Sequence, residues 1–206
     1  MIVMAGMIGA GKTTYTTKIA QALGTTPFYE AVDDNPILSK YYENPDKYGF
    51  ALQIYFLNKR FKSIKEAFYE QNNVLDRSIY EDALFTKINV ENGNISKEEY
   101  QLYLELLENM MEELKSLPKK APDLMIYLAA DFDHIMNNIK KRGRVYEQPT
   151  EENGLLGYYY QLYRAYGHWF ESYDYSPKLK INVSQYDVEK KADWKEVFSQ
   201  IQAKLA

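Results

Sequence analysis

The sequence predicts an α/β fold in which a parallel sheet is flanked by helices, and two observations support this prediction. Short apolar segments alternate with longer segments of helical periodicity, which is typical of parallel sheets. A glycine-rich loop follows the first apolar segment and precedes a helical one. The candidate strands are Ile2–Ala5, Pro27–Val32, Asn73–Asp76, Asp123–Ala129 and Lys178–Val183. No repeat, low-complexity tract or linker is visible, so we expect a single domain over residues 1–206.

The glycine-rich loop carries the most specific pattern in the chain. It matches the phosphate-binding pattern Gly-x4-Gly-Lys-Ser/Thr with the residues Gly6, Met7, Ile8, Gly9, Ala10, Gly11, Lys12 and Thr13. A helix is predicted over Thr13–Leu23, so backbone N–H groups and the helix N-terminus would surround the phosphates of a nucleoside triphosphate. We expect the loop and Thr14 to bind the nucleotide, with Lys12 at the β- and γ-phosphates and Thr13 on Mg²⁺. A glycine-rich turn without a ligand is the alternative, which the lysine and threonine in register disfavour.

Charged residues close the second and third candidate strands, at the edge where ligands bind in open α/β sheets. Asp76 and Arg77 would lie beside the phosphate loop if the first and third strands are neighbours. The carboxylate could then hold Mg²⁺ through water, and the arginine could neutralise phosphoryl oxygens. Glu30 could accept a proton from an attacking hydroxyl. A surface Asp–Arg pair and a solvated glutamate are the alternatives, and position alone slightly favours the solvated form of Glu30.

Two long helices are also predicted. The first covers about Tyr48–Glu70, and on it Gln53 and Arg60 lie nearly two turns apart at the margin of the apolar face. A ligand base would satisfy these polar groups, although nearby backbone and acidic groups are at least as common as partners. The second helix covers Lys97–Leu117, and its broad apolar surface indicates either core packing or a subunit interface.

Two further patterns concern the ends of helices. Asn35 followed by Pro36 predicts an N-cap and a first helical residue. A helix from about Asp131 ends in the basic run Lys140–Arg144, with Gly143 as its C-cap. The same basic run is also typical of a mobile lid whose arginines close over a triphosphate.

The composition argues against several classes of protein. The net charge of -4 at pH 7 gives no global basic field for nucleic acid. The absence of cysteine excludes disulfides, thiolate metal sites and cysteine nucleophiles. No secretory signal is visible, and no apolar run reaches the length of a membrane-spanning helix. We therefore expect a cytoplasmic protein with no nucleic-acid partner and no membrane partner.

In their order along the chain, the motifs resemble those of the deoxyribonucleoside kinase family, and most closely those of bacterial deoxyadenosine/deoxyguanosine kinases. The landmarks, which extend over nearly the whole chain, are the phosphate loop, Tyr29–Pro36, Tyr42–Pro45, Gln53–Leu57, Asp76–Asp82, Pro122–Leu124 and Lys141–Arg144 with Glu147. The resemblance implies a P-loop kinase fold, with a five-stranded parallel sheet, helices on both faces and a short lid at about residues 138–152. It also implies a homodimer, or a heterodimer with a close paralogue, and favours the interface role for the second long helix.

The resemblance implies catalytic and metal-binding roles by position. Glu30 matches the general base for the 5′-hydroxyl of the substrate. Arg77 matches the arginine beside that hydroxyl and the transferred phosphate, and Lys12 is the lysine of the phosphate loop. Asp76 stands where many members have Glu, and either carboxylate can serve Mg²⁺.

The resemblance also implies a nucleoside pocket and a lid. Tyr42 and Glu147 match the pair that holds the sugar 3′-hydroxyl. Gln53 matches the amide that contacts the base, and Arg60 and Asp82 complete the polar end of the base pocket. The lid arginines that contact ATP match Arg142 and Arg144.

Two positions depart from the family pattern. Asn138 stands where many relatives have a basic residue, so the lid has fewer charges. Thr86 occupies the position nearest to that of the aromatic that stacks on the base, with Phe85 beside it. Both departures bear on which bases are accepted.

The resemblance implies a kinase that uses Mg²⁺ and moves the γ-phosphoryl of ATP to the 5′-hydroxyl of a purine deoxyribonucleoside, with deoxyadenosine favoured and deoxyguanosine possible. A nucleoside monophosphate kinase, such as a thymidylate kinase, is the alternative enzyme, but Glu30 would repel its anionic acceptor. The non-enzyme alternative is a nucleotide-controlled binding module, which would leave Tyr42, Gln53 and Glu147 without a purpose.

Overall fold

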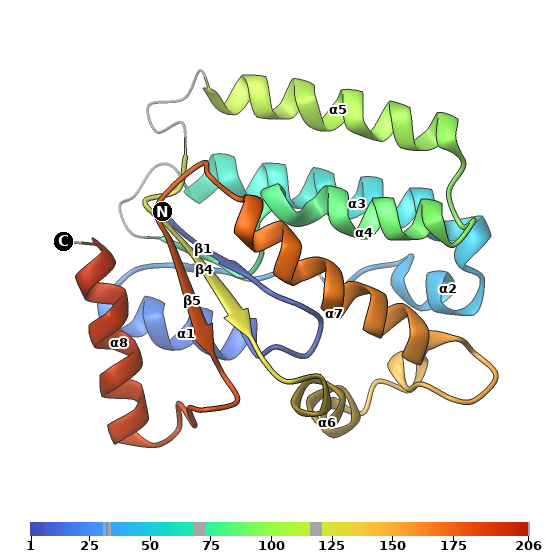
Figure 1. Ribbon diagram of the computed structural model, residues 1–206. Coiled ribbons are helices and arrows are strands. Elements are labelled where there is room, and N and C mark those ends of the chain that lie inside the picture. The colour runs from blue at the N-terminus through green and yellow to red at the C-terminus, as the bar shows by residue number, and fades with distance from the viewer. Residues whose placement is uncertain (31, 33, 68–72, 116–120, 206) are drawn as a thin grey trace.

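The computed structural model describes residues 1–30, 32, 34–67, 73–115 and 121–205, and these form one parallel sheet surrounded by helices (Figure 1). The strands are β1 (Ile2–Ala5), β2 (Pro27–Phe28), β3 (Val74–Leu75), β4 (Leu124–Ala129) and β5 (Lys178–Asn182). Their order across the sheet is β2-β3-β1-β4-β5. The central strand β1 lies between β3 and β4. The strands β2 and β3 lie on one side of β1, and the later strands β4 and β5 lie on the other side. A switch point of this kind creates a crevice at the carboxyl ends of the strands.

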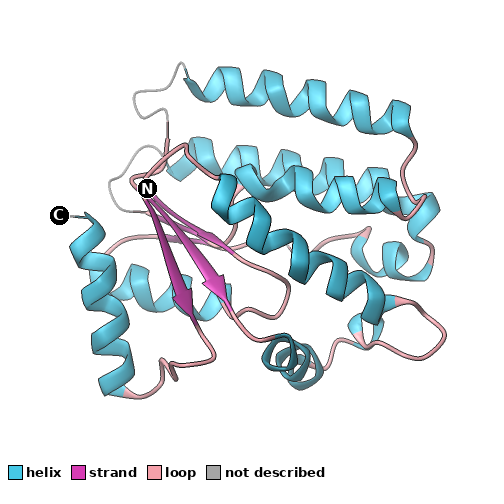
Figure 2. Ribbon diagram, viewed as in Figure 1, coloured by secondary structure: helices cyan, strands magenta, loops and turns pink. Residues whose placement is uncertain are grey.

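Helices cover both faces of the sheet (Figure 2). The α-helices are α1 (Lys12–Leu23), α2 (Leu38–Glu43), α3 (Pro45–Ala67), α4 (Asp82–Glu91), α5 (Lys97–Lys115), α6 (Phe132–Arg142), α7 (Leu155–Ser172) and α8 (Lys191–Leu205). Two short 3₁₀ turns are η1 (Ile79–Glu81) and η2 (Val145–Glu147). None of the helices in the described ranges is long and apolar enough to cross a membrane.

The central strand β1 is buried on both sides, and its side chains alternate between two cores. Ile2 and Met4 belong to a cluster formed with α1 and α8, whereas Val3 and Ala5 belong to a cluster formed with α3 and α5. Each fully buried aliphatic side chain stabilises the fold by about 1.5–3 kcal/mol. This double burial fixes the position of the strand end from which the phosphate loop starts.

All five predicted strands are present, but β4 and β5 are each one residue shorter than predicted, and β2 and β3 are shortened more strongly. The segment Pro27–Val32 pairs only as far as Phe28, and Asn73–Asp76 pairs only at Val74–Leu75. The last backbone bond between these segments runs from Asp76 N to Phe28 O, at 2.8 Å. The chain then leaves the sheet, so Glu30 lies two residues beyond the end of β2.

The predicted start of α2 was wrong. Pro36 is not the first helical residue, because α2 begins at Leu38. Asn35 nevertheless caps backbone groups, since its side-chain oxygen accepts bonds from Ile37 N (2.9 Å) and Leu38 N (3.1 Å). Its cap serves the turn that precedes the helix.

The other helix predictions are confirmed within a few residues. The first long helix begins earlier than predicted, at Pro45, and the lid helix ends with Gly143 as its C-cap at φ 73°. The predicted last residues of the two long helices, 68–70 and 116–117, lie outside the described residues, as does residue 31 of the second predicted strand.

Candidate active site

The phosphate loop connects β1 to α1 at the switch point of the sheet. Two of its glycines are required by the local structure. Gly6 has φ 148°, and a Cβ there would lie 2.9 Å from the carbonyl oxygen of Leu128. Gly9 has φ 82° and packs against α6, where a Cβ would lie 3.0 Å from Ile139 Cγ1. The loop thus fits between β4 and α6 only because these positions lack side chains.

Lys12 is buried beneath this loop. Its Nζ donates hydrogen bonds to the carbonyl oxygens of Gly6 (2.8 Å) and Met7 (3.1 Å). Burial, together with repulsion from Arg77, lowers the pKa of Lys12 to about 8, although neighbouring acids favour its charged form. A buried cation whose charge is incompletely compensated is suited to bind an anion.

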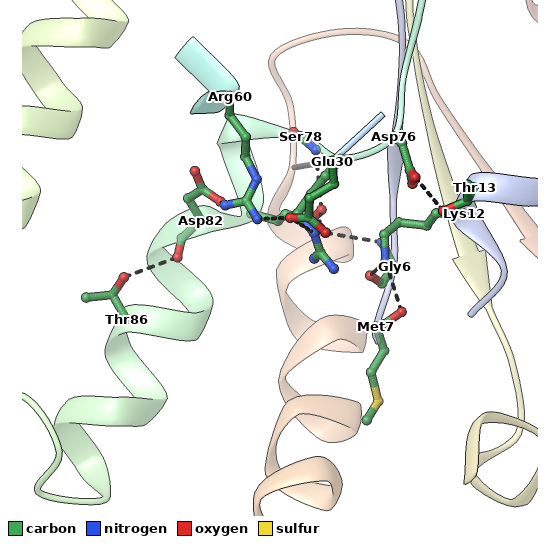
Figure 3. A network of polar contacts seen from close by, with 12 residues as sticks. Gly6, Met7, Lys12, Thr13, Glu30, Arg60, Asp76, Ser78, Asp82 and Thr86 are labelled. Carbon is green, nitrogen blue, oxygen red and sulfur yellow. Dashed lines mark hydrogen bonds and ion pairs between the residues drawn. The ribbon is translucent and has the colours of Figure 1, made fainter. Parts of the chain in front are cut away.

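Thr13 and Asp76 lie next to each other at this end of the site (Figure 3). The Thr13 hydroxyl donates to Asp76 Oδ2, whereas the buried Asp76 Oδ1 has no hydrogen-bond partner among the described residues. Burial raises the pKa of Asp76 to about 6, despite the nearby charge of Lys12. A hydroxyl and a carboxylate with a spare oxygen fit Mg²⁺, which prefers oxygen ligands.

Glu30 lies between two arginines. Its Oε1 forms an ion pair with Arg77 Nε at 2.9 Å and a second ion pair with Arg60 Nη2. Burial alone would raise the pKa of Glu30, but Arg77 first, then Arg60 and Lys12, lower it to about 2. The solvated form that position alone favoured is therefore wrong, because the side chain is largely buried and paired with two arginines.

Arg60 extends this network to Asp82, with which Arg60 Nη1 forms a buried ion pair (Figure 3). Asp82 Oδ2 and Arg60 Nε have no hydrogen-bond partner within the described ranges. Gln53 lies two turns before Arg60 on α3 and is also buried. Buried polar groups with unused bonding capacity are costly unless a ligand satisfies them.

The segment predicted as a lid brings three charged residues together. Glu147, at the end of η2, is 3% exposed and pairs with Arg142 Nη2 at 2.5 Å and Arg144 Nη1 at 3.4 Å. The Glu147 backbone oxygen accepts a bond from Tyr159 OH at 2.9 Å, which ties the segment to α7. The ring of Tyr42 packs against Tyr146 with the ring centroids 5.4 Å apart.

One cavity of about 880 Å³ collects most of the predicted residues. Those lining it are Ile8, Gly9, Gly11, Lys12, Thr13, Thr14, Glu30, Tyr42, Gln53, Arg60, Asp76, Arg77, Arg142, Arg144 and Glu147. Four predicted residues do not line it, namely Gly6, Met7, Ala10 and Asp82. The three loop residues lie in the phosphate loop but do not face the cavity. Asp82 pairs with Arg60, which does line the cavity.

Sequence reasoning did not assign Phe56 to the site and did not foresee the contacts that Thr86 and Asn138 make. Phe56 lines the cavity one turn after Gln53, and the Arg60 guanidinium lies 4.9 Å from its ring centroid. Thr86, at the position expected to stack on the base, instead donates to the Asp82 backbone oxygen at 3.4 Å. Asn138, the departure in the lid, donates to Gly9 O at 2.8 Å. The helical spacing from Gln53 could have identified Phe56, but only the fold reveals the Asn138 contact.

A phosphate loop at the switch point of a parallel sheet, opening on a cavity lined by buried acids and arginines, defines a phosphotransferase with the P-loop kinase fold. The family model described as deoxynucleoside kinase matches residues 2–206. The chain therefore belongs to the deoxynucleoside kinase family and is an ATP-dependent kinase of this class.

Named relatives and solved structures agree with this assignment. The chain is 52% identical over 206 residues to a deoxyguanosine kinase of Lactobacillus johnsonii, a match covering 100% of this chain and 92% of the relative. It is 45% identical over 206 residues to a deoxyadenosine kinase of Lactobacillus acidophilus, covering 100% of this chain and 96% of the relative. It resembles the structure of deoxyadenosine kinase from M. mycoides with bound dATP, with a TM-score of 0.82, 30% identity and 98% of each chain covered.

Proposed function

We propose that the protein transfers the γ-phosphoryl group of ATP to the 5′-hydroxyl of a purine deoxyribonucleoside. The observation that carries this proposal is the shared cavity, which the phosphate loop and the acid–arginine network both line. Its volume of about 880 Å³ is within the range of small-molecule sites. The loop offers N–H groups and a lysine to a triphosphate, and the residues around Gln53 offer apolar walls and polar groups to a nucleoside.

Glu30 is the proposed general base. Its pKa of about 2 keeps it ionised at neutral pH, so it can take the proton of the 5′-hydroxyl as that oxygen attacks the γ-phosphorus and ADP leaves. Arg77, paired with Glu30, would neutralise the oxygens of the transferred group. A neutral hydroxyl acceptor suits this carboxylate, whereas the anionic acceptor of a nucleoside monophosphate kinase would be repelled.

Tyr42 and Glu147 are proposed to hold the sugar through its 3′-hydroxyl. Glu147 is a buried carboxylate on the cavity wall, and Tyr42 supplies a phenolic hydroxyl on the same wall. Arg142 and Arg144 would contact the phosphates of ATP from the lid. Both arginines pair with Glu147. The residue that holds the sugar would therefore be in direct contact with the residues that hold the triphosphate.

Mg²⁺ belongs to the proposal through two residues of this chain. Thr13 and Asp76 would hold it, and when bound it supplies positive charge to the phosphate oxygens. Lys12 would add a second positive charge beneath the phosphates. Because burial raises the pKa of Asp76 to about 6, this carboxylate is mostly ionised for metal binding above that pH and becomes protonated as the pH falls below it.

For the base, we propose deoxyguanosine ahead of deoxyadenosine, the nucleoside that the resemblance to the family favoured. An arginine fits the O6 and N7 acceptors of guanine, whereas an amide fits the N6/N7 edge of adenine. The pocket contains both Arg60 and Gln53. The relative at 52% identity is a deoxyguanosine kinase and the one at 45% a deoxyadenosine kinase. A guanine that draws Arg60 away from Glu30 would also make that carboxylate more basic.

Initial rates of ATP consumption with each of the four natural deoxynucleosides test this proposal. We expect deoxyguanosine and deoxyadenosine to be phosphorylated with the highest specificity constants, and the product to be the 5′-monophosphate. Turnover only with nucleoside monophosphates would instead support the alternative enzyme. ATP binding without turnover of any acceptor would support a binding module.

A dimer and a cytoplasmic location also remain predictions. Within α5, Tyr103 and Leu114 are buried in the core of this chain, while Leu102 is 56% exposed. Core packing therefore accounts for part of the apolar surface, and we propose that the rest contacts a second subunit. Light scattering at micromolar concentration should give the mass of a dimer, and Leu107→Glu or Met111→Glu should shift it toward a monomer. A monomeric wild-type protein would refute the proposed interface.

A further inference from the structure

Glu81 is a fully buried acid to which the proposed reaction gives no role. It ends η1, and its side chain is 0% exposed. Glu81 Oε2 accepts a hydrogen bond from Gly6 N at 3.1 Å. Glu81 Oε1 lies 3.3 Å from Arg77 Nη1 and accepts a second bond from Ser78 N, also at 3.3 Å. One carboxylate thus contacts the first residue of the phosphate loop and the arginine beside Glu30.

The contact with Gly6 fixes the start of the phosphate loop from two sides. Glu81 accepts from the Gly6 N–H group, and Lys12 Nζ donates to the Gly6 carbonyl oxygen at 2.8 Å. A side chain at this position would meet the backbone of Leu128, since a Cβ on Gly6 would lie 2.9 Å from its carbonyl oxygen. The orientation of Gly6, and with it the placement of Lys12, therefore depends on Glu81.

The contact with Arg77 fixes the other side of the site. Arg77 Nη1 also donates to Tyr166 OH, on α7, at 2.9 Å, while Arg77 Nε faces Glu30 at 2.9 Å. The acids Glu30 and Glu81, together with Tyr166, hold the pKa of Arg77 well above its usual range despite burial. Glu81 and Tyr166 thus fix the guanidinium on the side opposite to Glu30.

A helix cap is the simpler explanation for Glu81, because Ser78 and Glu81 form a capping box around η1. A capping box requires only one hydrogen bond from the N3 carboxylate to the backbone N–H of the N-cap residue. Here the second oxygen reaches Gly6, 75 residues away in the sequence, and the whole side chain is buried. The cap therefore leaves the longer-range contact unexplained.

Building on the proposed function, we infer that Glu81, supported by Tyr166, is a positioning residue that holds the phosphate loop and Arg77 in one rigid arrangement. The loop positions ATP and Arg77 faces the acceptor, so Glu81 sets the alignment of donor and acceptor without touching either. Misalignment of reacting groups by about 1 Å can cost about 10²-fold in rate.

The test uses Glu81→Gln, which keeps the shape but replaces one acceptor oxygen with an NH₂ group that must face a donor. We expect kcat to fall by about 10- to 100-fold, by the same factor for every deoxynucleoside, because the base pocket is unchanged. The dissociation constant for ATP, measured by calorimetry, should rise several-fold. Tyr166→Phe removes only the hydroxyl on Arg77 and should lower kcat by a smaller factor. Tyr173→Phe is the matched control, since its buried hydroxyl contacts Ser176 at 2.8 Å, away from the cavity.

A purely structural role for Glu81 would lower the melting temperature but leave kcat and ATP affinity of the folded protein unchanged, and this result would overturn the inference. If Glu81→Gln does not fold, the test uses Tyr166→Phe instead. A kcat of Tyr166→Phe equal to that of Tyr173→Phe would then overturn the inference. If the wild-type protein phosphorylates no deoxynucleoside, the proposed function fails. In that case the positioning role is tested by ATP binding alone. A weaker ATP affinity of Glu81→Gln would support the role, and an unchanged affinity would contradict it.

Discussion

The cavity has a phosphate end, with Lys12 and Asp76, and an acceptor end, with Glu30 and its two arginines. The two ends compensate their buried charges in opposite ways. At the phosphate end, burial lowers the pKa of Lys12 to about 8 and raises that of Asp76 to about 6, so burial disfavours the charged form of each group. At the acceptor end, the arginines lower the pKa of Glu30 to about 2 against the effect of burial. At the phosphate end, Asp76 Oδ1 has no hydrogen-bond partner among the described residues, whereas at the acceptor end Glu30 is neutralised by two arginines of the chain.

This difference indicates what each region requires from its ligands. The phosphate end gains from an incoming anion and a metal ion, which would further stabilise the charged forms of Lys12 and Asp76. The acceptor end is preorganised, since Glu30 and Arg77 are already held at 2.9 Å, and preorganised charges need little rearrangement during a reaction. Substitutions at the acceptor end should therefore act mainly on kcat, and those at the phosphate end also on ATP affinity.

Glu30→Gln should have the largest effect, because it removes the proposed proton acceptor and one partner of two arginines. Loss of a general base lowers the rate by about 10²- to 10⁴-fold, and we expect ATP affinity to stay nearly unchanged. Steady-state kinetics with calorimetry of ATP binding measure both quantities. Glu43→Gln, an exposed acid on α2, is the control. Near-native turnover of the folded Glu30 variant would remove Glu30 from the mechanism.

Lys12→Ala should follow, with a loss of about 10²- to 10³-fold in rate. Unlike Glu30→Gln, it should also weaken ATP binding, and the loss should be equal for every acceptor because the lysine contacts only phosphates. Lys18→Ala on the same helix is the matched control, since Lys18 pairs with Glu189 at 3.3 Å and does not line the cavity. Unchanged ATP affinity and rate in Lys12→Ala would contradict the contrast between the two ends.

Gln53→Ala should weaken nucleoside use far more than ATP use. A missing hydrogen-bond partner in a buried site costs about 1–3 kcal/mol, or roughly 5- to 150-fold in kcat/KM. Unequal losses for deoxyadenosine and deoxyguanosine would identify the base that pairs with the amide. Asn58→Ala, an exposed amide on α3, is the control. Equal losses for all bases, or no loss, would mean that Gln53 does not contact the base.

The phosphate end could be predicted in detail because its information is local. The motif from Gly6 to Thr13 is contiguous, and its glycines, lysine and helix start fix one another's positions. The neighbourhood of β1 and β3 was a condition of the prediction for Asp76 and Arg77, and the register Ile2 to Val74 confirms it. The succession of short apolar segments and helical segments predicted a parallel sheet, whereas the order of its strands came from the structure.

The acceptor end depends on contacts between distant segments, so the sequence indicated its residues but not their pairing. Glu30 resembled a solvated acid until the fold brought Arg60 and Arg77 to it. Glu81 had no assigned role in the sequence analysis, because its partner Gly6 is remote in sequence and Tyr166, which shares Arg77 with it, belongs to α7. Tertiary packing decides such burial, and neither spacing nor local propensity encodes it.

The smallest expected effect is a pH dependence confined to the phosphate end. Because the folded-state pKa of Asp76 is raised to about 6, its carboxyl group takes up a proton as pH falls through 6, and a protonated carboxyl is a poor ligand for Mg²⁺. The Mg²⁺ concentration for half-maximal rate should rise by about tenfold for each pH unit below 6 and be flat between 7 and 8. ATP itself also titrates, so the ratio of wild type to Asp76→Asn isolates the contribution of the protein. A ratio that does not change between pH 5 and 8 would show that Asp76 does not serve the metal, and the phosphate end would then depend on Lys12 alone.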